Sequence, residues 1–162
     1  MIVGVIGGGE VSTEVGRLAE EVGKRIAEGG AILLCGGKGG VMEMACKGAK
    51  EAGGLTVGIL PSMNPDDANP YVDVRIPTGM GHARNAIVAV ASDVLVAIGG
   101  RYGTLSEIAH ALNLGKTVVG LGTWKLEEID VGRNFIPAKD PTDAVRIALE
   151  IATRQTAGGR SA

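Results

Sequence analysis

The sequence predicts a single α/β domain in which a doubly wound, mainly parallel sheet lies between two layers of helices. Apolar segments of strand length alternate with segments of helix length along the chain. The predicted strands consist almost entirely of Val, Ile and Leu, which is typical of parallel strands covered on both faces. The length of 162 residues matches one domain, and 45% hydrophobic with 21% charged residues excludes a disordered chain.

Strands are predicted at short apolar runs, of which the last is the weakest: Ile2–Ile6, Ala31–Cys35, Thr56–Leu60, Val72–Ile76, Asp93–Ile98, Thr117–Leu121 and Asn134–Pro137. The first helix follows from apolar residues at helical spacing, which are Val15, Leu18, Ala19, Val22 and Ile26. Further helices are expected at Val41–Ala52, His82–Ser92, Leu105–Leu114 and Thr142–Thr153. Asp140–Pro141 gives the last one a cap and a first-turn proline. This order predicts a three-layer, Rossmann-like domain over residues 1–154 and a flexible tail at 155–162.

Composition limits the partners and the location of the protein. A net charge of −2 and only four aromatic residues argue against a nucleic-acid partner. Cys35 and Cys46 cannot form a disulfide framework, and with two histidines beside them we expect no metal site. We expect both thiols to pack as small apolar groups in the cytoplasm. Neither a membrane span nor a signal peptide is expected, since no apolar run is long enough.

The 27 glycines form two groups. Gly29–Gly30 and Gly53–Gly54 follow predicted helices, which they end. The other group follows predicted strands, at the sheet edge where open α/β sheets bind ligands and where helix N-termini favour anions. This second group predicts a site for a phosphate-bearing small molecule. It includes Gly8, Gly9, Gly36, Gly37, Gly99 and Gly100. The alternative is that tight strand-to-helix turns simply need glycine.

Two common phosphate-binding motifs are excluded. The dinucleotide fingerprint that starts at Gly7 would need Gly or Ala where Ser12 stands, and no acidic residue ends the second strand. The Walker-type loop would need Ser or Thr after Lys38, and Gly39 follows it. NAD enzymes and nucleoside triphosphatases are therefore disfavoured.

The segment Gly99–Glu107 leaves a buried strand and enters a helix. Its backbone N–H groups, including that of Gly103, and the hydroxyls of Thr104 and Ser106 are suited to cradle a phosphate. Glu107 has an alternative role, because Thr104-x-x-Glu107 has the spacing of a helix capping box.

The segment Thr78–Asn85 precedes an apolar helix, Ala86–Ala91, which we expect to be buried in the domain or in a homo-oligomer interface. Arg84 stands at the head of that helix and requires an anionic partner, either a ligand or a carboxylate such as Glu107. We assign supporting roles to Met80 and His82 as well as to Ser106. His82 has the alternative role of a turn histidine, and Met42 and Met44 are expected in the core or the pocket lining.

The two segments together resemble those of the Rossmann-like family that includes the LONELY GUY phosphoribohydrolases and the "lysine decarboxylase-like" proteins. The carrying motifs are Gly-Met-Gly-His-Ala-Arg-Asn, Gly79 to Asn85, and Gly-Gly-x-x-Gly-Thr-Leu-Ser-Glu, Gly99 to Glu107. The resemblance reaches from the first glycine turn to about Gly122. It is closer still to the branch of molybdenum cofactor carrier proteins.

The resemblance implies that Arg84 and Glu107 are a catalytic pair, as in the hydrolases. It also implies that Gly99, Gly100, Gly103 and Thr104 hold a phosphate. The chain departs from the hydrolases in having Ile98 in place of proline, a longer loop before Gly103, and Asn85 in place of lysine.

These departures favour binding of a nucleotide or a pterin, such as the molybdenum cofactor, without a cofactor being required for chemistry. The expected function is that of a molybdenum cofactor carrier. The alternative is hydrolysis of the N-glycosidic bond of a nucleoside 5′-monophosphate.

Overall fold

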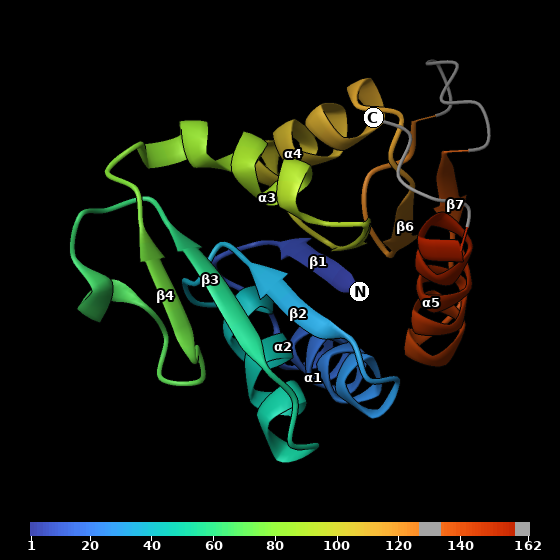
Figure 1. The fold of residues 1–162 in the computed structure, drawn as a ribbon, viewed down its shortest axis with the longest axis horizontal. Coiled ribbons are helices and arrows are strands. Elements are labelled where there is room, and N and C mark those ends of the chain that lie inside the picture. Colours follow the sequence, from blue (N-terminus) through green and yellow to red (C-terminus); the bar gives the residue numbers. More distant parts are fainter. Residues whose placement is uncertain (127–133, 158–162) are drawn as a thin grey trace.

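The computed structural model describes residues 1–126 and 134–157, and within them a seven-stranded sheet is formed. All its strand pairs are parallel, and the order across the sheet is β4-β3-β2-β1-β5-β6-β7 (Figure 1). The strands are β1 Ile2–Gly7, β2 Ile32–Cys35, β3 Thr56–Leu60, β4 Val74–Pro77, β5 Val94–Ile98, β6 Val118–Leu121 and β7 Phe135–Pro137. The Rossmann-like α/β class expected from the sequence is confirmed.

Helices cover both faces of the sheet, as the apolar character of the strands requires. They are α1 Thr13–Glu28, α2 Val41–Glu51, α3 Asn85–Ala91, α4 Tyr102–Asn113 and α5 Pro141–Ala157. One core cluster joins α1, α2 and α5 to one face, and a second joins α3 and α4 to the other (Figure 1). Short 3₁₀ turns, η1 Pro65–Asp67 and η2 Gly81–Arg84, precede β4 and α3.

Glycines allow α1 and α2 to cross at backbone contact. A Cβ atom built on Gly23 would overlap the carbonyl of Ala45, and one built on Gly48 would overlap the carbonyl of Glu20. Since no side chain fits between the two helices, α1 and α2 are locked side by side and fix the positions of β1 and β2, which precede them.

The strand order reverses between β1 and β5. The chain runs outward from β1 through β2, β3 and β4, and then returns to β5 on the other side of β1. Val5 pairs with Val96, and Gly7 with Ile98, so the carboxyl ends of both strands lie next to each other. This reversal is the position at which sheets of this type bind ligands.

Several predicted boundaries are wrong, each for a local reason. The helix predicted at His82–Ser92 is divided, because Gly79 and Gly81 have φ of +66° and +56° and only a 3₁₀ turn follows them. Helix α4 begins at Tyr102, three residues before the predicted Leu105.

Strand β4 begins two residues later than predicted. The N–H of Val72 closes the preceding turn on the carbonyl of Asn69 at 3.2 Å, and Asp73 lies in a bend. The Asp73 carboxylate accepts hydrogen bonds from the N–H and hydroxyl of Thr56, at 3.0 and 3.1 Å. Helix α5 continues to Ala157, beyond the predicted Thr153 and into the first residues of the expected tail. The Asp140 cap is confirmed, since its carboxylate accepts from the N–H of Asp143 at 2.8 Å. Residues 158–162 lie outside the described part of the chain.

Candidate functional site

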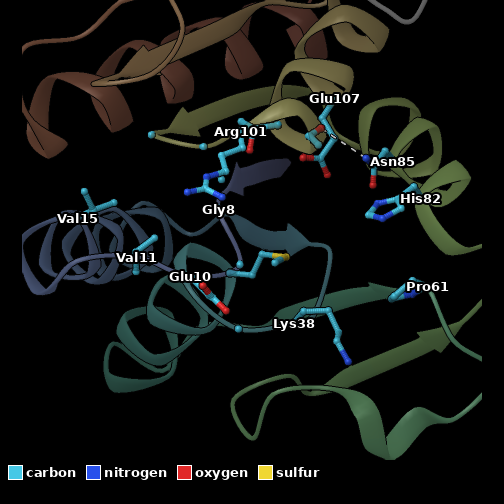
Figure 2. A pocket seen from close by; sticks show the side chains of 18 of the residues that line it. Gly8, Glu10, Val11, Val15, Lys38, Pro61, His82, Asn85, Arg101 and Glu107 are labelled. Carbon is cyan, nitrogen blue, oxygen red and sulfur yellow. Dashed lines mark hydrogen bonds between the residues drawn. The ribbon is translucent and has the colours of Figure 1, made fainter.

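A cavity of about 1020 Å³ opens where β1 and β5 end. Of the residues expected at the site, the structure brings nine to its lining: Gly8, Gly9, His82, Arg84, Gly99, Gly100, Gly103, Thr104 and Glu107. Figure 2 shows Glu107, Asn85 and His82 along one wall, with Glu10 and Lys38 on the opposite side. Segments that are far apart in the sequence therefore form one pocket.

The glycine turns after β1 and β2 contact each other. The N–H of Val41, which begins α2, donates to the carbonyl of Gly8 at 2.9 Å. A Cβ atom on Gly40 would overlap that same carbonyl, and Gly40 also has a φ of +65°. No side chain caps the N-terminus of α2 or of α4, so backbone N–H groups there are left for other acceptors.

The turn after β5 is equally tight. Gly100 has a φ of +97°, and a Cβ atom there would overlap the side chain of Thr104. Thr104 is only 3% exposed and stands in the first turn of α4. It does not cap α4, because that helix begins two residues earlier. The capping box suggested by the spacing of Thr104 and Glu107 is therefore wrong, and the Glu107 carboxylate is directed elsewhere.

Arg84 is the buried cation of the pocket, with 8% of its surface exposed. Its Nη1 donates to Asn85 Oδ1 at 2.8 Å and to Glu107 Oε1 at 3.4 Å. Its Nε has no hydrogen-bond partner. The partner required by Arg84 thus includes the Glu107 carboxylate, but the long contact and the unpaired Nε leave the guanidinium incompletely satisfied.

Glu107 is 6% exposed and faces Arg84 from α4. Burial raises the pKa of its carboxyl to about 7, although the positive charge of Arg84 opposes the rise. The carboxyl of Glu107 is therefore partly protonated at neutral pH. It can act as a proton donor or acceptor, and it neutralises Arg84 only in part.

Four expected site residues do not line the cavity. Gly36 lies under the Arg84 guanidinium, and Gly37 packs against Leu60 with a φ of +71°. For Gly37 the alternative explanation holds, since the turn itself needs glycine. Met80 is 49% exposed outside the pocket, and Ser106 accepts a hydrogen bond from Asn85 behind its wall.

Sequence reasoning missed the polar lining residues Glu10 and Lys38. The lining residues Val11, Val15 and Pro61 were also missed. Glu10, Val11, Lys38 and Pro61 stand within four residues after the end of a strand. The argument that identified the glycines could therefore have found them. Val15 could not be found in this way, because it lies inside α1.

Met42 and Arg101 also line the cavity. Met42 is 8% exposed and belongs both to the core and to the pocket, so the two roles expected for it coincide. Arg101 is exposed at the rim, where its carbonyl accepts from the indole N–H of Trp124 at 3.2 Å.

Both cysteines are free and fully buried beneath the glycine turn after β2, with their sulfurs 3.5 Å apart. The hydrogen bond between the two thiols lowers the pKa of Cys35 and raises the pKa of Cys46. In the described ranges no group of three or more His, Cys, Asp or Glu residues could hold a metal ion. Nor does any helix there have the length and apolarity needed to cross a membrane.

The reversed strand order and the pocket beside it define a Rossmann-like α/β protein with its site at the switch point of the sheet. The chain belongs to the SLOG cluster4 family, whose sequence model matches residues 1–151. The family resemblance expected from the two motifs is therefore confirmed.

Two solved structures and one enzyme are similar to this chain. The molybdenum cofactor binding protein from Rippkaea orientalis has a TM-score of 0.87 at 40% identity, covering 93% of this chain and 96% of that chain. The molybdenum cofactor carrier protein from Chlamydomonas reinhardtii has a TM-score of 0.85 at 41% identity, covering 94% and 98%. The cytokinin riboside 5′-monophosphate phosphoribohydrolase LOG from Oryza sativa subsp. japonica is 34% identical over 112 residues, 64% of this chain. The match covers only 46% of that hydrolase.

Proposed function

We propose that the protein binds a phosphate-bearing small molecule at this pocket and acts as a carrier of a pterin such as the molybdenum cofactor. The buried guanidinium of Arg84 carries the proposal. Its contact with Glu107 is 3.4 Å long, its Nε is unpaired, and burial raises the pKa of Glu107 to about 7. An anionic ligand would supply the missing counter-charge, since a buried charge without one is costly.

The lining suits a heterocycle that carries a phosphate. Gly8, Gly9 and Gly100 present backbone to the cavity, and the N-termini of α2 and α4 favour negative charge there. The apolar part of the lining contains Val11, Val15, Met42 and Pro61. A pterin or purine ring would lie against these aliphatic side chains, because none of the described lining residues is Phe, Tyr or Trp. The likeness to two molybdenum cofactor proteins favours the pterin.

Protein purified without denaturation tests the proposal. Native mass spectrometry and pterin fluorescence should detect a bound cofactor, and neopterin monophosphate and adenosine monophosphate should bind in calorimetry. Arg84→Ala should weaken binding roughly 10- to 100-fold, since hydrogen bonds to a charged group contribute about 1.5–3 kcal/mol. Arg146→Ala is the matched control, because Arg146 is an exposed arginine on α5 that is not part of the lining. No binding of either phosphate by the unmodified protein would refute the proposal.

Hydrolysis of a nucleoside 5′-monophosphate is the second candidate, favoured by the presence of Arg84 and Glu107 in one pocket. In that reaction water adds to C1′ of the ribose, the bond from C1′ to the base breaks, and the base leaves with a proton. Glu107 would stabilise the oxocarbenium-like transition state and orient the water, with Arg84 fixing the substrate.

Free base measured after incubation with a panel of nucleoside 5′-monophosphates separates the two candidates. Turnover that is lost in an Arg84→Ala, Glu107→Ala double variant would establish the hydrolase. Binding of neopterin monophosphate together with base release no faster than in the double variant would establish the carrier.

We also propose that the protein forms a homo-oligomer. Val90 on α3 is 61% exposed, and Val74 and Ile76 on the edge strand β4 are 43% and 41% exposed. Val74 pairs in register with Val57, and Ile76 with Ile59, which places them on the sheet face that α3 covers. Light scattering should therefore give a mass above that of one chain. A monomer at micromolar concentration would contradict this.

A further inference from the structure

Asn85 directly follows Arg84, begins α3 and is 4% exposed. Both ends of its side-chain amide are used. Its Oδ1 accepts from Arg84 Nη1 at 2.8 Å, while its Nδ2 donates to Ser106 Oγ at 3.1 Å and to the carbonyl of Gly103 at 3.5 Å. Asn85 thus connects the buried cation to the first turn of α4, which carries the glycine loop of the pocket.

The bond from Arg84 to Asn85 is its shorter one, at 2.8 Å against 3.4 Å to Glu107. Because the guanidinium also rests on Gly36, it is held from two directions. The amide supplies an acceptor and a donor at once, which neither an aspartate nor a lysine could do. The Asn85 amide also carries no charge, so it orients the Arg84 guanidinium without neutralising the positive charge.

We propose that Asn85 is a positioning residue that fixes the Arg84 guanidinium relative to the loop at Gly103 while leaving its positive charge for a ligand. The inference rests on the proposed function, since Asn85 would hold Arg84 in the position in which it binds an anionic ligand. In this role Asn85, which itself stands in the lining of the pocket, acts through Arg84.

Three variants separate positioning from charge. Asn85→Ala removes every bond of the amide. Asn85→Asp keeps an acceptor for Arg84 but adds a negative charge beside it and removes the donor to the Gly103 carbonyl. Ser106→Ala leaves Asn85 in place and removes one of its acceptors, which gives a milder variant should Asn85→Ala fail to fold.

Three measurements are made on each variant. ¹⁵N NMR of the arginine side chains reports whether the Arg84 guanidinium is held, with no ligand present. Titration with inorganic phosphate and with adenosine monophosphate reports anion binding. Thermal unfolding shows whether the fold is retained.

In Asn85→Ala we expect the restricted Arg84 NMR signals to be lost and anion affinity to fall about tenfold, the effect of one hydrogen bond to a charged group. In Asn85→Asp the Arg84 signals should persist while affinity falls at least as much, because the charge is then neutralised. Ser106→Ala should give intermediate effects on both.

Unchanged Arg84 signals and affinity in a folded Asn85→Ala would overturn the inference, and so would full affinity in Asn85→Asp. Failure of the proposed function gives a different result. The unmodified protein would then bind neither phosphate nor adenosine monophosphate, although Asn85→Ala would still release the Arg84 side chain.

Discussion

The guanidinium of Arg84 lies directly on the backbone of Gly36. A Cβ atom built on Gly36 would be 2.6 Å from Arg84 Cζ, well inside van der Waals contact. Gly36 does not line the cavity. The position of the Arg84 guanidinium in the cavity nevertheless depends on the absence of a side chain at Gly36. The glycine after β2 is therefore connected to the cavity through Arg84.

Gly36→Ala should displace the Arg84 side chain and reduce the affinity for inorganic phosphate as strongly as Arg84→Ala does, roughly tenfold or more. The fold should survive, because the overlapping atoms are the end of a flexible side chain. Calorimetry and thermal unfolding measure the two effects. Gly16→Ala is the control, since its Cβ would meet Met44 at an ordinary 3.6 Å inside α1. Equal phosphate affinity of Gly36→Ala and the unmodified protein would contradict the prediction.

The pKa of Glu107 predicts how stability changes with pH. Burial raises it from 4.5 to about 7, so the folded protein keeps a proton that the unfolded chain releases. The contribution of Glu107 to stability is therefore fully present below pH 4.5 and is lost as the pH rises through 7. Relative to Glu107→Gln, the unfolding free energy should fall by up to about 3 kcal/mol between pH 4.5 and 8.

Urea denaturation at several pH values measures that difference. Glu150→Gln on the exposed side of α5 is the control and should keep the pH dependence of the unmodified protein. Parallel pH profiles for the unmodified protein and Glu107→Gln would show that Glu107 titrates normally in the fold.

Gly48→Ala should destabilise the protein by at least about 2 kcal/mol, since the added methyl group would overlap the backbone of α1 at Glu20. Gly16→Ala again serves for comparison and should be neutral or slightly stabilising, as expected for glycine to alanine within a helix. The readout is the urea midpoint. A Gly48→Ala midpoint equal to that of Gly16→Ala would mean that α1 and α2 do not cross at backbone contact.

The burial of Cys35 and Cys46 predicts that neither thiol reacts with a thiol reagent in the native protein. Both should react once the chain is unfolded in guanidinium. Mass spectrometry after a short pulse of iodoacetamide counts the modified thiols. Rapid labelling of either thiol under native conditions would show that the region beneath Gly36 opens readily.

The fold and half of the site follow from local patterns. Continuous Val and Ile runs indicated the parallel strands, and strand ends followed by glycine located the pocket rim at Gly8 and Gly100. The pairing of Arg84 with Glu107 was among the alternatives, because a cation at the head of an apolar helix needs an anionic partner.

The remainder depends on distances that no local pattern contains. Nothing in the sequence places Gly36 under Arg84, since the turn after β2 and the 3₁₀ turn η2 come together only in the folded protein. Nor does spacing show that α4 begins at Tyr102, which removed Thr104 from the capping position. The bonds of Asn85 to α4 were hidden for the same reason, although its difference from the lysine of the hydrolases was visible.

The pairing of Val5 with Val96 brings together parts of the chain that leave the ribosome at different times. During synthesis β1, β2 and β3 can assemble with α1 and α2, but one wall of the cavity is missing until α4 has been translated. If the pocket binds the proposed ligand, it can do so only after Glu107 has been translated. Protection of a growing chain from proteases by that ligand should begin at this length and not before.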